Sequence, residues 1–140
     1  MVKKYKKSTK DILVLQVLPH LNSGGLVSGA VEIAAALNKR NYKSFVATSG
    51  GYKENELLRA NTHIEKMPLD SKNIFTMLSN KKKLIKLISK FKINLIHARS
   101  RAPAWSAYWA AKELNIPFVT TFHGTYGLEN FLKKKYNSIM

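Results

Sequence analysis

Short apolar runs alternate with segments of helical period along most of this chain. The first run, residues 12–18, is almost continuously apolar, as in a parallel strand buried on both faces. Similar runs predict further strands at residues 44–48, 63–67, 94–98 and 118–122. Helical patterns lie between and after them, at residues from 28 onward, 54–60, from 70 or 71 to 91, 102–114 and 128–136. This order predicts an α/β, Rossmann-like domain: a parallel sheet with right-handed crossovers and helices on both faces.

The length of 140 residues suits a single domain with a real core. We expect a basic tail at residues 1–10 and one domain over residues 11–140. The lysine-rich start followed by an apolar run imitates a signal peptide. That run, however, is short, contains Gln16, and meets Pro19 and His20 without a small-residue cleavage site. A buried strand behind a solvated tail is the better interpretation.

The net charge of +16 is the largest departure from an average composition. Only four of the 24 basic residues are arginine, the residue that specific nucleic-acid readers favour for bidentate contacts, so no specific nucleic-acid partner is expected. The lysine excess has two interpretations, a lysine-rich proteome or a functional field for polyanions. On the helix ending near residue 91, Lys82, Lys86 and Lys90 share one face. That face fits either peripheral contact with an anionic membrane or plain solvation.

Several classes of chemistry find no support in the sequence. With no cysteine, the chain has no disulfide, no Cys-ligated zinc and no thiol nucleophile. No cluster of histidines and acids suggests a metal site, and no serine or threonine lies in a nucleophile motif. Gly24, Gly25 and Gly29 do not fit the dinucleotide fingerprint, and no P-loop is present. We therefore expect neither a metal nor a bound cofactor.

The candidate site residues lie where predicted strands end, because ligands of open parallel sheets bind beyond the carboxyl ends of the strands. Gly24 and Gly25 precede the helix that Ser28 is expected to cap, so their backbone could approach an anion; the alternative is a turn that needs positive φ. Arg99 and Arg101 flank Ser100 just after the fourth strand. They suit either a phosphate or carboxylate ligand or an ordinary surface.

Two histidines and one tryptophan in these segments have to be assigned either a structural or a functional role. His123, followed by Gly124 and Thr125, stands at the exit of the fifth strand, where a functional role is favoured over a structural one. His97 lies within the fourth strand and is expected to be packed and hydrogen bonded. For Trp105, core packing is favoured over stacking on a sugar.

Taken together, several segments resemble family 4 glycosyltransferases, and the resemblance covers almost everything after Lys10. The matching segments are VLQVLP (14–19), SGG (23–25), GAVEIA (29–34), MPLDSKN (67–73), IHARSRAPAW (96–105) and TTFHGTY (120–126). The resemblance implies the amino-terminal half of a GT-B fold, whose first domain mainly receives the acceptor and whose second domain binds a nucleotide-sugar donor. Relative to that fold, the last strand of the first domain and the acidic donor-binding motif have no counterpart here, so a marginal fold is expected unless another polypeptide completes it.

The resemblance also implies roles for the candidate residues. Gly24 and Gly25 would approach the donor diphosphate or an acceptor group, and His123 would lie near the transferred sugar. Arg99, Arg101, Gly124 and Thr125 would contact substrate. Such enzymes generally retain anomeric configuration without a metal, using the nucleotide sugar as a co-substrate.

The partners that follow from this resemblance are a glycan or lipid-linked acceptor and a separate donor-binding polypeptide. The expected setting is envelope polysaccharide or lipopolysaccharide synthesis in the cytoplasm, at the inner face of the membrane. The alternative is a non-catalytic fragment that binds a glycan or polyanion.

Overall fold

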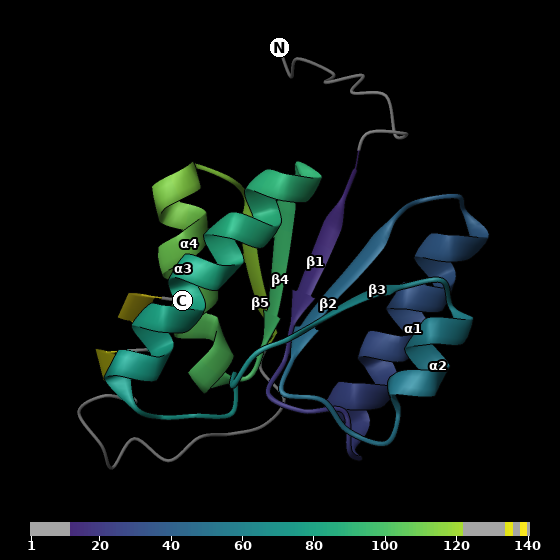
Figure 1. Ribbon diagram of the computed structural model, residues 1–140, viewed down its shortest axis with the longest axis horizontal. Helices are drawn as coiled ribbons and strands as arrows, with labels where there is room; N and C mark the ends of the chain where they lie inside the picture. The colour runs from purple at the N-terminus through teal and green to yellow at the C-terminus, as the bar shows by residue number, and fades with distance from the viewer. Residues whose placement is uncertain (1–11, 122–133, 136–137, 140) are drawn as a thin grey trace.

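The computed structural model describes residues 12–121, 134–135 and 138–139. Strands and helices alternate over this part of the chain, as the sequence predicts (Figure 1). The elements are β1 (Val14–Val17), α1 (Gly25–Lys39), β2 (Ser44–Thr48), α2 (Glu54–Arg59), β3 (His63–Lys66), α3 (Ile74–Phe91), β4 (Leu95–Arg99), α4 (Arg101–Leu114) and β5 (Phe118–Thr121).

The strands form one parallel sheet in the order β3-β2-β1-β4-β5. Strand β1 lies at its centre, paired with β2 on one side and β4 on the other. All four residues of β1 and all five of β2 are buried, which explains why both strands are mainly apolar in sequence. The predicted parallel α/β fold is confirmed.

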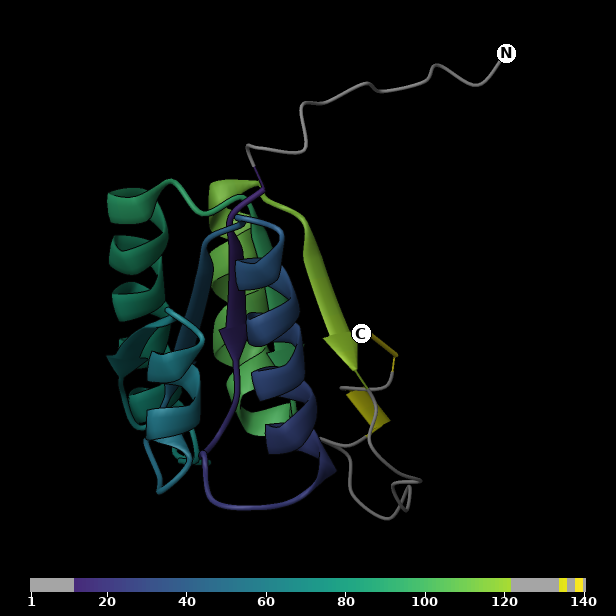
Figure 2. The same cartoon turned by 90° about the vertical axis from the view of Figure 1, so that its right-hand side faces the viewer.

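Helices cover both faces of the sheet in two layers (Figures 1 and 2). Helices α3 and α4 pack on one face, over side chains such as Leu15, Phe45 and Ile96. Helices α1 and α2 lie on the other face and enclose a smaller cluster around Val46 and Leu57. Leu84, Leu87 and Ile88 of α3 are buried, as the periodicity of that helix predicts.

Two predicted helix starts are wrong. Helix α1 begins at Gly25, capped by the backbone of Gly24, and Ser28 lies within the helix. Helix α3 begins at Ile74 rather than near Asp70 or Ser71, because Asn73 caps it: its side chain accepts hydrogen bonds from the amides of Phe75 at 2.9 Å and Thr76 at 3.3 Å.

The boundaries of β4 and β5 decide where some of the candidate residues lie. Strand β4 runs one residue further than predicted, so Arg99 is its last residue and does not lie beyond it. Strand β5 is described to Thr121 and lies at an edge of the sheet. The predicted strand end at Phe122 and most of the predicted helix 128–136 lie outside the described residues.

Candidate functional site at the carboxyl edge between β1 and β4

The chain diverges between the two neighbouring strands β1 and β4. From β1 it passes through α1 to β2 on one side, and from β4 it passes through α4 to β5 on the other. Helices α1 and α4 lie on opposite faces of the sheet (Figure 1). Ligands of open α/β sheets bind beyond the carboxyl ends of the strands at such a point of divergence. This edge, at the bottom of Figure 1, is therefore the candidate site.

Helix α1 begins on this edge with exposed backbone. The first intrahelical bonds are donated by Val27 and Ser28 to the carbonyl of Gly24, so the amides of Gly25 and Leu26 precede them. Gly24 has φ 105° and ψ 166°, a conformation that is essentially restricted to glycine. Apart from chain neighbours and the backbone of the helix itself, a Cβ atom built at Gly24 or Gly25 meets none of the described residues within 4 Å. A ligand can therefore approach this helix end closely, and the helix dipole favours an anion there.

Helix α4 begins on the same edge with the same backbone geometry. Ser100 alone connects β4 to α4, with φ 103° and ψ 154°, close to the values of Gly24. Its hydroxyl makes no capping hydrogen bond. A serine with these φ and ψ values carries about 1–3 kcal/mol of backbone strain, and such strain is typical of functional sites. Arg101, half-buried, is the first residue of the helix.

Arg99 is the last residue of β4, at the edge where both helices begin, and its side chain joins three elements. Its Nε donates to Oε1 of Gln16 in β1 at 3.1 Å, and its Nη2 donates to the carbonyl of Gly29 in α1 at 3.4 Å. Gln16 in turn donates through Nε2 to the carbonyl of Ala30 at 2.9 Å. A Cβ atom at Gly29 would lie 3.1 Å from Nη1 of Arg99, so glycine leaves room for the guanidinium.

The burial of Arg99 corrects one sequence-based alternative. Its side chain is only 3% exposed, so it is not an ordinary surface residue. Burial lowers the pKa of Arg99 from its usual range, although a guanidinium stays charged at neutral pH. Among the described residues no carboxylate forms an ion pair with Arg99. Its positive charge therefore adds to the positive electrostatic field at the starts of α1 and α4.

Gln16 is the site residue that sequence reasoning missed. It is fully buried, and both ends of its amide are hydrogen bonded. The available signal was one amide in an otherwise apolar strand, because a buried amide requires partners.

The loop from β1 to α1 is fixed by the loop that follows β2. Leu21, fully buried, donates its amide to the carbonyl of Gly50 at 2.9 Å and accepts from the amide of Lys53 at 3.0 Å. Gly51 has φ 153°, and a Cβ atom there would lie 2.5 Å from the carbonyl carbon of Leu21. The two loops are thus in direct backbone contact, which limits where Gly24 and Gly25 can lie.

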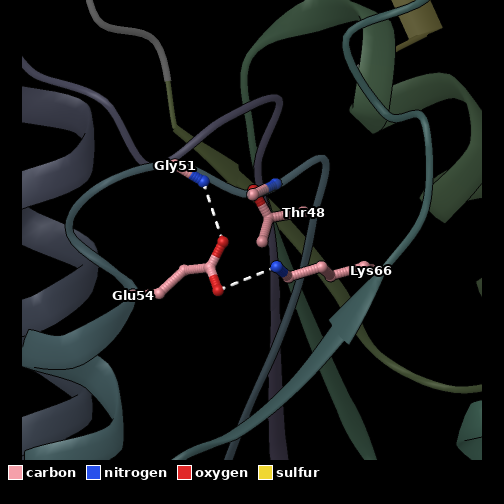
Figure 3. Close-up of polar contacts among 5 residues, drawn as sticks. Thr48, Gly51, Glu54 and Lys66 are labelled. Atoms are coloured by element: carbon pink, nitrogen blue, oxygen red, sulfur yellow. Dashed lines mark hydrogen bonds and ion pairs between the residues drawn. The ribbon is translucent and has the colours of Figure 1, made fainter.

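A carboxylate stabilises that second loop (Figure 3). Glu54 accepts a hydrogen bond from the amide of Gly51 at 3.0 Å, and its other oxygen lies 2.9 Å from Nζ of Lys66. The Gly51 amide, and then the Lys66 ammonium, lower the pKa of the Glu54 carboxyl. The amide of Gly50 donates to Oγ1 of Thr48 at 3.3 Å.

The other predicted site residues are placed only in part. His123, Gly124 and Thr125 lie outside the described residues. Strand β5 reaches the same edge, where Thr121 is in register with Arg99. His97 is hydrogen bonded through Nε2 to Oγ1 of Thr121, as predicted for a packed histidine. Trp105 packs partly buried against the larger core cluster, as the core alternative predicts.

Residues 12–121, 134–135 and 138–139 contain no group of three or more histidines and acids that could hold a metal ion. None of the helices in this part of the chain has the length and apolar character of a membrane span.

Comparison with known proteins now identifies the family. The family model Glycosyltransferase Family 4 matches residues 23–140, which include both helix starts and Arg99. The chain belongs to glycosyltransferase family 4. No curated protein matches it.

Two solved structures, of a glycosyltransferase and of MurG, resemble this chain. A glycosyltransferase from Rickettsia africae is 41% identical, with a TM-score of 0.80 over 91% of this chain. The match covers 34% of that protein, so the family 4 chain spans about a third of its length. MurG from Acinetobacter baumannii has a TM-score of 0.68 at 14% identity, covering 91% of this chain and 39% of MurG, and shows the fold alone. The fold is that of a GT-B amino-terminal domain.

Proposed function

We propose that this domain is the acceptor side of a retaining, nucleotide-sugar-dependent glycosyltransferase of envelope polysaccharide or lipopolysaccharide synthesis. The supporting observation is that α1 and α4 both begin at the edge that holds the buried Arg99. The backbone at Gly25 is open, and Arg99 is charged with no acidic partner among the described residues. Such a site favours an anion, as the diphosphate of a nucleotide sugar is.

The proposed division of labour follows the two-domain GT-B pattern. A second, donor-binding domain or polypeptide presents the nucleotide sugar across this edge. The acceptor, a glycan or a lipid-linked sugar, binds on the β1–β4 edge. Arg101, Gly124 and Thr125 are the proposed substrate contacts, and His123 is the proposed catalytic residue near the transferred sugar. No metal and no bound cofactor takes part, and the departing diphosphate takes the proton of the acceptor hydroxyl.

A chimera tests this proposal. The chain replaces the corresponding first third of the Rickettsia africae glycosyltransferase, to which it is 41% identical. Transfer of labelled sugar from a panel of nucleotide-sugar donors is then measured, with the unmodified Rickettsia protein as the control. The proposal predicts transfer by the chimera. If the control is active and the folded chimera transfers no sugar from any donor, the proposal is wrong.

The second candidate is a non-catalytic domain that binds a glycan or polyanion. The net charge of +16 favours this alternative. It predicts that the chain binds polyanionic glycans by calorimetry while the chimera remains inactive.

A further inference from the structure

Three large apolar side chains are exposed on the first turns of α3. Phe75 is 78% exposed, Ile74 50% and Leu78 43%. Contacts elsewhere on α3 hold it against the molecule: Met77 and Leu84 are buried on its inner side. The three exposed side chains are therefore not part of the core. They gather on one helix end, unlike scattered apolar residues on an ordinary surface.

Lysines continue the same outward face of α3. At 3.6 residues per turn, Lys82 and Lys86 follow Phe75 on one side of the helix, and both are exposed. Phe75 and Lys86 are separated by about 16 Å along the axis. Exposed Lys83 and Lys90 flank this row. The outer face of α3 is thus apolar at its start and basic along the rest.

The stretch of sequence around these lysines contains no acidic residue. The sequence has no aspartate or glutamate between Asp70 and Glu113. Glu113 of α4 pairs with Lys81, on the flank of α3, at 2.6 Å. None of the ion pairs among the described residues involves Lys82 or Lys86. Within the described part of the chain, this face is therefore strongly basic and has no ion pair at Lys82 or Lys86.

The apolar end of α3 lies on the same edge as the candidate site. Helix α3 follows β3 and returns antiparallel to the sheet, so its first turn lies at the carboxyl ends of the strands, at the bottom of Figure 1. Two side-chain bonds fix that turn. Asn80 donates to the carbonyl of Pro68 at 2.8 Å, and Ser106 of α4 donates to the carbonyl of Met77 at 3.0 Å.

We propose that this α3 face docks on an anionic phospholipid bilayer, with Ile74, Phe75 and Leu78 inserted below the headgroups and Lys82 and Lys86 against the phosphates. A bilayer offers an apolar layer and a negative surface side by side, which matches the order of residues along the helix. A second copy of this chain fits less well, because two such basic faces repel each other. The docking places the candidate edge beside the membrane. Its consequence for the substrate rests on the proposed function: the acceptor is then a lipid-linked one.

Single-cysteine labelling tests the insertion. Because the chain has no cysteine, Phe75→Cys and Leu58→Cys each give one site for an environment-sensitive fluorophore. Leu58 is the matched control, since it is 57% exposed on α2 in the opposite layer. With vesicles of phosphatidylcholine and phosphatidylglycerol, we expect a blue shift at position 75 and none at position 58. With phosphatidylcholine alone, we expect little shift at either position.

Charge variants test the headgroup contact. Lys82→Gln with Lys86→Gln removes two charges from the α3 face, and Lys39→Gln with Lys43→Gln removes two exposed charges from the α1 side. We expect vesicle affinity to fall about 5-fold for each lysine removed from α3 and much less for the control pair. Equal losses in both pairs would overturn the proposal.

Other outcomes also contradict the docking. Binding that ignores phosphatidylglycerol, or equal shifts at positions 75 and 58, would exclude an oriented contact. A blue shift at position 75 without vesicles that grows with protein concentration would show that a second copy covers the face. Vesicle binding is measured without sugar transfer, so its failure leaves the proposed function standing, and an inactive chimera leaves the docking standing.

Discussion

Arg99 and Gln16 meet from positions 83 residues apart in the sequence. A charged residue at a strand end is usually exposed, so sequence reasoning left Arg99 between a ligand contact and a surface residue. Its burial depends on two acceptors brought together by folding, the Gln16 side chain and the Gly29 carbonyl, and on the space that Gly29 leaves. Local sequence does not encode such a meeting. What it does encode is the anomaly of a glutamine in an apolar strand.

Replacing Arg99 by lysine tests this bridging role. A single ammonium does not reproduce the planar fork that reaches Gln16 and Gly29 together. We expect Arg99→Lys to lower the free energy of unfolding by about 1–3 kcal/mol, measured by urea denaturation. Arg59→Lys, on an exposed part of α2, is the control and should change it by less than about 0.5 kcal/mol. Equal effects in the two variants would show that Arg99 does not bridge the elements.

Glu54 gives a prediction with a defined pH dependence. The pKa of its carboxyl is lowered in the folded state, so its contribution to stability is present above the unfolded value and is lost as the pH falls through the folded value. We expect Glu54→Gln to be less stable than the parent at neutral pH by about 1 kcal/mol, since the carboxylate is partly exposed. Denaturation from neutral pH down to below the usual glutamate pKa of 4.5 should show the difference shrinking. A constant difference would contradict the role of the charged form.

At the level of elements, strand and helix positions follow from the sequence better than helix starts do. Strand β2 agrees with its apolar run because both faces of the sheet bury it. Helix α1 starts three residues earlier than predicted, since Gly24 adopts a positive φ that lets the backbone itself begin the helix. Before α3, Asp70, Ser71 and Asn73 all have good capping side chains. The side chain of Ser49 donates to Asp70 at 2.7 Å, which leaves Asn73 as the cap.

The cap of α3 is testable on its own. Asn73→Ala removes the acceptor for the amides of Phe75 and Thr76. We expect the free energy of unfolding to fall by about 1 kcal/mol, measured by thermal or urea unfolding. Asn73→Asp keeps an acceptor and should retain most of the stability. If alanine and aspartate are equally destabilising, the cap is not what stabilises this helix start.

For the whole molecule, the parallel sheet and its two helical layers bring distant loops to one edge. That convergence could be predicted, because strands connected by helices must run parallel and end on the same side. The order β3-β2-β1-β4-β5 could not be read from local pattern, and it is this order that makes β1 and β4 neighbours. The exposed start of α3 was missed as well, since Ile74, Phe75 and Leu78 read as part of a helix with a buried face.

In the proposed function, sugar transfer takes place at the edge where α1 begins. Gly25→Ala in the Rickettsia chimera tests it most directly. Outside its own helix backbone and chain neighbours, the added methyl group meets none of the described residues within 4 Å, so it reduces the space open to the proposed ligand without a clash in the domain. We expect a free energy of unfolding within about 0.5 kcal/mol of the parent chimera and a loss of sugar transfer of about 100-fold. Unchanged transfer by a stable Gly25→Ala chimera would contradict this proposal.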